Sequence, residues 1–224
     1  MILTERKRAQ TVAELSVELD IPQLRELIQR FLFQMVNPED PRDLINVPLH
    51  ECPIYDGRVK VFNAASATFF APSDISGVGG MRRELIRSNP SWRRGAPRLD
   101  CAFINTNPGI QGMQGMDVVR IRAFFSFKTQ DGEDYPCAVV RWFILSDEPD
   151  EDTGMWIVRP GYNARHQPDI SVVHIDTIHR AAHLIPVYGA QEIPSEIGPH
   201  HSYDVFRAYY VNKYADHHAF EIAS

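Results

Sequence analysis

Apolar residues recur at every second position from Val119 to Phe125, whereas charged residues fill several of the positions between them. Such a period of two is typical of a strand with one buried face. An Asp-Gly pair at 131–132, a frequent hairpin turn, separates this segment from the Val- and aromatic-rich segment 135–144. The pattern predicts that strands 118–127 and 135–144 pair antiparallel at the centre of a sheet.

The first forty residues follow a different period, with apolar residues at steps of three and four. This spacing is typical of amphipathic helices and predicts two of them, about 8–19 and 22–36, with Asp20 as the N-cap of the second. The same reasoning predicts helices at 81–88, 176–182 and 203–215. Further strands are expected at 58–63, 67–71, 99–105, 154–158, 170–175 and 184–188.

These elements indicate an α+β fold. We expect a curved antiparallel sheet or small β-barrel, with an N-terminal helical pair and a C-terminal helix. Residues 1–40 would form the helical segment, and residues 41–224 the α+β domain with its barrel-like core.

Composition narrows the class of protein. The 224 residues are 44% hydrophobic and 23% charged, which is ordinary for a globular chain, and no long apolar window predicts a membrane-spanning helix or a membrane partner. The three cysteines, Cys52, Cys101 and Cys137, are too widely spaced for a disulfide framework or a zinc ribbon, so a reducing compartment such as the nucleus or cytosol is expected. The net charge of −6 excludes a general polyanion binder, so any nucleic-acid contact must come from a local basic patch.

Such a patch lies between Met81 and Arg98, where six arginines accompany one acid, Glu84, and one tryptophan, Trp92. Guanidinium groups bind phosphates well, and an exposed tryptophan can stack on a base. The candidate nucleic-acid-binding residues are therefore Arg82, Arg83, Arg87, Trp92, Arg93, Arg94 and Arg98. The alternative is that these arginines pair with the acidic loop Asp147–Asp152 or with another cluster of surface carboxylates.

A second group of residues invites a metal hypothesis: His174, Asp176, His179 and His183. On a helix, His179 and His183 would share a face, which suits zinc and would allow a metal-dependent hydrolase. However, no glutamate follows the first histidine as a general base, and Asp176 is better used as a helix cap. We predict that the segment is structural, that the chain is not an enzyme, and that it needs no metal or cofactor.

A third group is aromatic. Tyr135, Trp142 and Trp156 could line a groove for a histone tail or another protein partner, with the acidic loop attracting a basic peptide. This protein-interaction module is the alternative to nucleic-acid binding.

Several long segments resemble the C-terminal region of transposase-like proteins of mushroom-forming fungi, the Plavaka group of the CACTA type. The matching segments are SDISGVGGMRRELIRSNPSWRRG, DVVRIRAFFSF, YPCAVVRWF, DEPDEDTGMWIV, IDTIHRAAHLIPVYG and RAYYVNKYADHHAFEIA. The resemblance implies a nuclear, transposon-derived accessory domain without the nuclease core, which would bind DNA or chromatin and position a transposase. It assigns no catalytic residues.

Residues 117–189 also resemble a bromo-adjacent homology domain, a small β-barrel with a Trp-Phe pair on a central strand and a charged loop after it. Trp142-Phe143 and Asp147–Asp152 occupy the comparable places. This second resemblance implies binding to nucleosomes, histone tails or other chromatin proteins. Neither resemblance indicates an oligomeric state.

Overall fold

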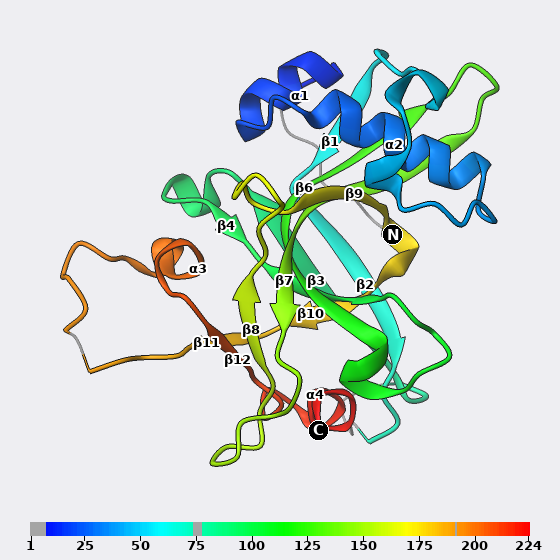
Figure 1. Cartoon of the computed structure of the whole chain (residues 1–224). Helices are drawn as coiled ribbons and strands as arrows, with labels where there is room; N and C mark the ends of the chain where they lie inside the picture. Colours follow the sequence, from blue (N-terminus) through cyan, green and yellow to red (C-terminus); the bar gives the residue numbers. More distant parts are fainter. Residues whose placement is uncertain (1–7, 74–77, 191) are drawn as a thin grey trace.

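A curved antiparallel sheet forms the centre of the molecule, and helices lie at its ends (Figure 1). The computed structural model describes residues 8–73, 78–190 and 192–224. Seven residues of the predicted 1–40 segment, and residues 74–77 of the first segment that resembles the transposase-like proteins, therefore lie outside the described residues. The helices are α1 (Val12–Leu19), α2 (Leu24–Val36), α3 (Ser202–Val205) and α4 (His217–Ala223).

The main sheet has the order β10-β5-β6-β7-β8-β12-β11, with β1 added beside β6 and β9 beside β7. A smaller sheet has the order β2-β3-β4. The strand bounds are β1 (Val59–Phe62), β2 (Ala64–Phe70), β3 (Met81–Asn89), β4 (Arg98–Leu99), β5 (Cys101–Asn105), β6 (Met116–Lys128), β7 (Asp134–Leu145), β8 (Ile157–Pro160), β9 (Ile170–His174), β10 (Ile178–Ala182), β11 (Leu184–Pro186) and β12 (Tyr209–Val211). All of these pairings are antiparallel, so the predicted α+β class and curved sheet are confirmed.

The long hairpin of β6 and β7 is the central unit, as the alternating pattern predicts. Its register runs from Val119 opposite Trp142 to Lys128 opposite Asp134. Gly132 closes the turn with a φ of 85°, a conformation that glycine adopts without strain. One extra residue, Arg122, forms a bulge between Ile121 and Ala123, and such bulges bend a strand and increase its twist.

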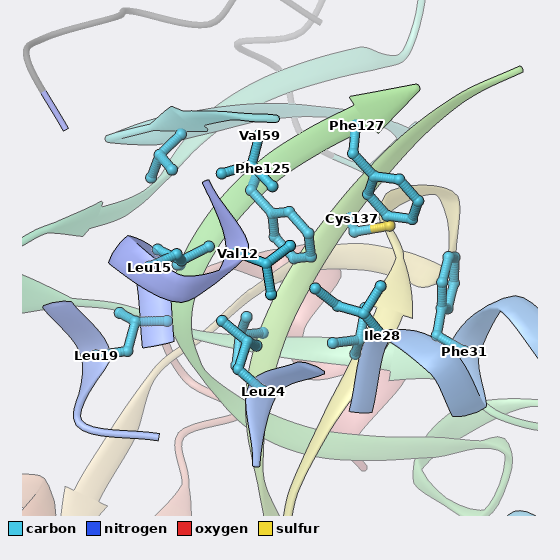
Figure 2. Packing of buried hydrophobic residues seen from close by; sticks show 14 of the residues in the cluster. Val12, Leu15, Leu19, Leu24, Ile28, Phe31, Val59, Phe125, Phe127 and Cys137 are labelled. Atoms are coloured by element: carbon cyan, nitrogen blue, oxygen red, sulfur yellow. The ribbon is translucent and has the colours of Figure 1, made fainter. Parts of the chain in front are cut away.

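The helical pair covers one end of this hairpin and shares its core. Apolar side chains of α1 and α2, including Leu15, Leu24 and Ile28, pack against Phe125 and Phe127 of β6 (Figure 2). The apolar faces expected from the three- and four-residue spacing are therefore the buried ones. Asp20 is not an N-cap: it ends α1 in a left-handed conformation with a φ of 55°, and its N–H is bonded to the last turn of that helix.

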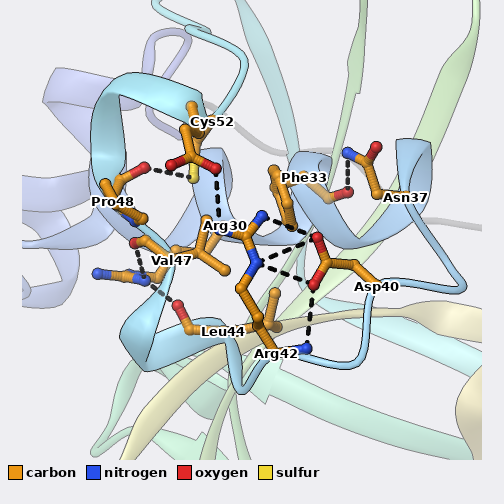
Figure 3. Close-up of polar contacts among 10 residues, drawn as sticks. Arg30, Phe33, Asn37, Asp40, Arg42, Leu44, Val47, Pro48 and Cys52 are labelled. Atoms are coloured by element: carbon orange, nitrogen blue, oxygen red, sulfur yellow. Dashed lines mark hydrogen bonds and ion pairs between the residues drawn. The ribbon is translucent and has the colours of Figure 1, made fainter.

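The chain after α2 folds back onto that helix (Figure 3). Arg30 donates hydrogen bonds from Nη1 to the carbonyl oxygens of Leu44 and Val47, the latter at 3.0 Å. Arg42 pairs with Asp40 and with Glu51, and its guanidinium lies over the ring of Phe33. These contacts fix residues 37–53 beside α2 without regular strands, through the short 3₁₀ turns η1 (Leu44–Asn46) and η2 (Leu49–Glu51).

A second cluster of buried side chains fills the opposite end of the same sheet face. It joins β5, β8, β11, β12 and α4, with Phe103, Phe143, Val158 and Tyr209 among its members. A third cluster, which includes Ile86 of β3, lies on the other face of β6 and β7, where the smaller sheet packs.

The cysteines at 52, 101 and 137 are buried and unpaired. Among the described residues, no helix is both long and apolar enough to cross a bilayer.

The expected helices at 81–88 and 176–182 are wrong, because both segments are strands. Met81–Asn89 is β3, which pairs with the whole of β2 after a turn in which Gly79 and Gly80 have positive φ. Residues 175–177 form the 3₁₀ turn η5 (Ile175–Thr177), and β10 then pairs with β5. Sheet pairing outweighs the helical propensity of sequences such as MRRELIRS.

The expected helix at 203–215 is also wrong. Only Ser202–Val205 is helical, and Tyr209–Val211 is a strand between β8 and β11. Tyr209 and Val211 are fully buried at a spacing of two. The C-terminal helix exists, but it begins later, at His217, where the Asp216 carboxylate accepts a hydrogen bond from the Ala219 N–H at 2.7 Å.

Candidate functional site

Trp92 is surrounded by arginine side chains. The guanidinium carbons of Arg87, Arg98 and Arg93 lie 5.0, 5.4 and 5.6 Å from its ring centroid. These distances are typical of cation–π contacts. Together with the exposed Arg94 of the same turn, these residues form what we call the Trp92 surface: Arg87, Trp92, Arg93, Arg94 and Arg98.

The backbone between β3 and β4 explains this geometry. The Ser91 N–H is bonded to Asn89 Oδ1 at 3.0 Å, and the Gly95 N–H to the Trp92 carbonyl at 2.9 Å, which closes the 3₁₀ turn η3 (Trp92–Arg94). Within it, Arg93 and Arg94 have φ values of 51° and 65°. Left-handed backbone is costly for residues with side chains and is concentrated at functional sites. Two consecutive arginines in this conformation make the turn a functional candidate.

The structure does not bring the whole predicted arginine cluster together. Arg83 lies further along β3 and donates from Nε to Ser66 Oγ at 2.5 Å. Arg82 lies in the region of α4, where its charge interacts with Asp216 and His218. Within the described part of the chain, none of the four arginines of the Trp92 surface forms an ion pair with the loop Asp147–Asp152; Arg98 pairs with Asp100 at 2.8 Å.

A second group of arginines, which the sequence analysis did not select, lies beneath this surface. Arg120 continues the face of Val118 on β6, and Arg141 lies between Val139 and Phe143 on β7. Both therefore separate the two apolar clusters of that face. Arg122, the bulge residue, joins them, since its charge interacts with those of Arg120 and Arg141. We call these three residues the arginine layer.

The arginine layer has one nearby ion-pair partner among the described residues. Asp204 Oδ1 lies 2.6 Å from Arg120 Nη1 and 3.8 Å from Arg141 Nη1. Burial, together with the positive charge of Arg120, lowers the pKa of Arg122. The Nε atoms of all three arginines are buried, and no group in the described part of the chain accepts a hydrogen bond from them. Buried polar groups are normally satisfied, so three unpaired nitrogen atoms at one level of the sheet are unusual.

A pocket of about 370 Å³ connects the two groups of arginines. Trp92 and Arg98 line it from the surface, Arg120 from the arginine layer, His200 from the turn before α3, and Tyr203 from α3 itself. A second hollow of about 320 Å³ lies beside Trp92 and is lined by Asn89, Ser91, Arg93 and Arg94. Trp92 lines both hollows.

The three aromatic candidates do not share a groove. Tyr135 packs beside Phe127, with ring centroids 5.4 Å apart, under the N-terminal helices. Trp142 donates from Nε1 to Ser171 Oγ at 2.7 Å and belongs to the cluster on the opposite face of the sheet. Trp156 is buried in the cluster beside α4. The three side chains thus belong to three different apolar clusters.

The histidines of the metal hypothesis are not gathered on a helix either. His179 lies on β10 and its ring faces that of His218, 5.6 Å away, whereas His183 is exposed after the strand ends. Among the residues that the structure describes, no group of three or more His, Cys, Asp or Glu side chains is placed to hold a metal ion.

Between these histidines lies Arg180, a wholly buried residue that the sequence analysis did not select. Its guanidinium binds Asp216 through two contacts of 2.9 and 2.6 Å, lies 3.5 Å from Glu84, and stacks on Phe69. Its Nη1 also lies 3.1 Å from His218 Nδ1, and since an arginine N–H can only donate, the histidine nitrogen is the acceptor in this contact. This network fastens α4 to β10, β3 and β2, which is a structural role.

Comparisons with protein-family models, with curated proteins and with solved structures give no match for this chain. The resemblances to transposase-like proteins and to bromo-adjacent homology domains therefore stay predictions. The Trp92 surface and the pocket beside it are the site with the most distinctive geometry.

Proposed function

We propose that this protein is a nucleic-acid-binding module and that the Trp92 surface contacts the phosphates of DNA. The observation that carries this proposal is the gathering of three guanidinium groups around Trp92. Guanidinium groups bind phosphate oxygens with two parallel hydrogen bonds, which lysine cannot do.

Electrostatics supports a local interface of this kind. The whole chain carries a net charge of −6, so its overall charge repels a nucleic acid. The Trp92 surface holds four arginines, and among the described residues Asp100 is the carboxylate that forms an ion pair with one of them, Arg98. A nucleic acid would therefore be oriented toward this surface as it approaches.

The role of Trp92 follows from its neighbours. Since guanidinium groups already occupy positions over its ring, we infer that Trp92 orders arginine side chains before binding rather than serving as an open stacking platform. Ordering flexible side chains in advance lowers the entropic cost of binding.

The transposon-derived origin belongs to the same proposal. A role in positioning a transposase on DNA or chromatin in the nucleus rests on the resemblance of the sequence, and the surface described here adds a means of contacting DNA.

The test compares two double variants in binding to a labelled DNA strand. Arg93→Ala with Arg94→Ala removes two exposed charges from the Trp92 surface, and affinity for unrelated sequences should fall about equally. Arg25→Ala with Arg165→Ala, on α2 and in the 161–168 loop, removes the same charge elsewhere and is the matched control. Equal losses in both double variants would contradict the proposal.

A further inference from the structure

The pocket beside Trp92 has a buried cation at its inner end. The Arg120 side chain is 4% exposed, and it lines the pocket together with the exposed Arg98. Of its five N–H donors, one nitrogen, Nη1, is bonded to Asp204, while Nε has no partner among the described residues. A guanidinium buried in this way is a strong binding element for any anion that reaches it.

The charges around the pocket favour an anion. Arg98 and Arg120 both line the pocket, Arg141 shares Asp204 with Arg120, and the charge of Arg122 interacts with that of Arg120. Two carboxylates oppose them. Asp100 lines the pocket but accepts hydrogen bonds from Arg98 Nε at 2.8 Å and from the Arg87 N–H at 2.9 Å. One carboxylate oxygen of Asp204 contacts both Arg120 and Arg141, and the Asp204 side chain is 47% exposed.

The burial of the Arg120 guanidinium limits which kinds of anion can reach it. A phosphodiester within a strand carries a nucleoside on each side and has a single charge. A phosphomonoester at the end of a strand carries one nucleoside and nearly two charges at neutral pH. The terminal phosphate can therefore bring its oxygens to a side chain as buried as that of Arg120. An internal phosphate could do so only if both neighbouring nucleosides also entered the pocket.

We propose that this pocket binds the terminal phosphate of a nucleic-acid strand, with Arg120 and Arg98 holding the phosphate. The proposal rests on the function proposed above and makes it more specific: the Trp92 surface follows the strand, and the pocket receives its end. Trp92, His200 and Tyr203 then surround the terminal nucleoside.

The experiment compares single strands of about ten nucleotides that differ only at one end. Fluorescence anisotropy is measured for strands with a 5′-phosphate, a 3′-phosphate or no terminal phosphate. Each phosphorylated strand carries its label at the opposite end, and the unphosphorylated strand is prepared in two forms, one labelled at each end. We expect one phosphorylated end to bind about tenfold more tightly than the matched hydroxyl. Orthophosphate added at constant ionic strength should remove that preference.

Two variants assign the effect to the pocket. Arg120→Gln should abolish the preference for a terminal phosphate while leaving the weaker binding of the unphosphorylated strand. Asp204→Asn keeps Arg120 and removes its competing carboxylate, so the preference should increase. Circular dichroism checks that each variant is folded, and the wild-type comparison needs no variant.

The outcomes separate the two proposals. Equal affinity for phosphorylated and unphosphorylated strands would overturn the terminal-phosphate pocket and leave the Trp92 surface as a phosphodiester-binding site. A preference that survives in folded Arg120→Gln would also overturn it. No binding of any strand at low salt would overturn both proposals.

Discussion

Arg120 on β6 and Arg141 on β7 lie directly opposite each other, and one carboxylate oxygen of Asp204 contacts both guanidinium groups. Like charges opposed across a strand pair destabilise a sheet unless an anion compensates for them. Here they lie between two apolar clusters, where desolvation adds to the cost. The centre of this sheet therefore depends on a carboxylate supplied by α3, far along the chain.

The first prediction concerns that carboxylate. Asp204→Asn should lower the free energy of unfolding, because it leaves two nearly buried arginines without an ion-pair partner. We expect a loss of about 1–3 kcal/mol, less than for a wholly buried pair because Asp204 is 47% exposed. Urea unfolding measures it, with Asp147→Asn in the acidic loop as the control. An unchanged midpoint would show that Asp204 does not neutralise the layer.

The second prediction concerns Arg180. Arg180→Met should cost about 3–5 kcal/mol, since the Asp216 and Glu84 carboxylates would remain poorly solvated without a cation. Asp216→Asn keeps the cap of α4, because asparagine caps as well as aspartate, and it leaves Arg180 beside Glu84, so it should cost less. Equal costs for the two substitutions would contradict a compensating role for Glu84. A loss below about 1 kcal/mol for Arg180→Met would contradict the role given to this network.

The third prediction concerns pH. Burial lowers the pKa of His179 and of His218 below 6.5, and the charge of Arg180 contributes to both shifts. Below pH 6.5 the unfolded chain therefore takes up protons that the folded protein resists. The contribution of these two histidines to the free energy of unfolding is therefore fully present above pH 6.5. It is lost as the pH decreases toward their lowered pKa values.

Urea unfolding at about pH 7.5 and about pH 5.5 checks this. The wild type should be less stable at the lower pH, and the difference should shrink in the double variant His179→Gln with His218→Gln. Asp216, whose pKa is lowered chiefly by its bond to Arg180, loses its contribution only at much lower pH, so it does not confuse the comparison. Equal pH dependence in the two proteins would assign the effect to other groups.

The fourth prediction concerns Trp92. If its ring orders the arginines, Trp92→Ala should weaken DNA binding by roughly tenfold, because exposed cation–π contacts contribute about 0.5–1 kcal/mol each. Trp92→Phe keeps an aromatic ring and should recover part of the loss. Anisotropy titrations of the three proteins measure this. Affinity that is equal in wild type and Trp92→Ala would mean that the ring does not contribute.

The sequence pattern predicted the elements whose apolar spacing can be seen within a single segment of the chain. The hairpin of β6 and β7 followed from period-two apolar residues around Asp131-Gly132, and the N-terminal helices from their apolar spacing. The segments 81–88 and 176–182 were predicted as helices because their own residues favour a helix, whereas the pairing that makes them strands involves residues outside each segment. Their partners, β2 and β5, are specified by the whole sheet.

The sequence predicted only part of the site, because the positions of its residues also depend on how the sheet is assembled. The density of arginines around Trp92 is visible in the sequence, but their separation into a surface group and the distant Arg82 and Arg83 follows from the extended form of β3. Arg120 was visible only as a charged residue alternating with apolar ones. Its burial depends on α3, which brings Asp204 to it from 84 positions further along the chain.

The most direct test of the central proposal is the salt dependence of DNA binding. Neutralising phosphates releases counterions, so the logarithm of the association constant should fall linearly with that of the salt concentration. For three or four contacts to a single strand, we predict a slope of about −2 to −3, reduced by about half or more in the Arg93→Ala, Arg94→Ala variant. A slope near zero, or no measurable binding at about 20 mM salt, would contradict the account.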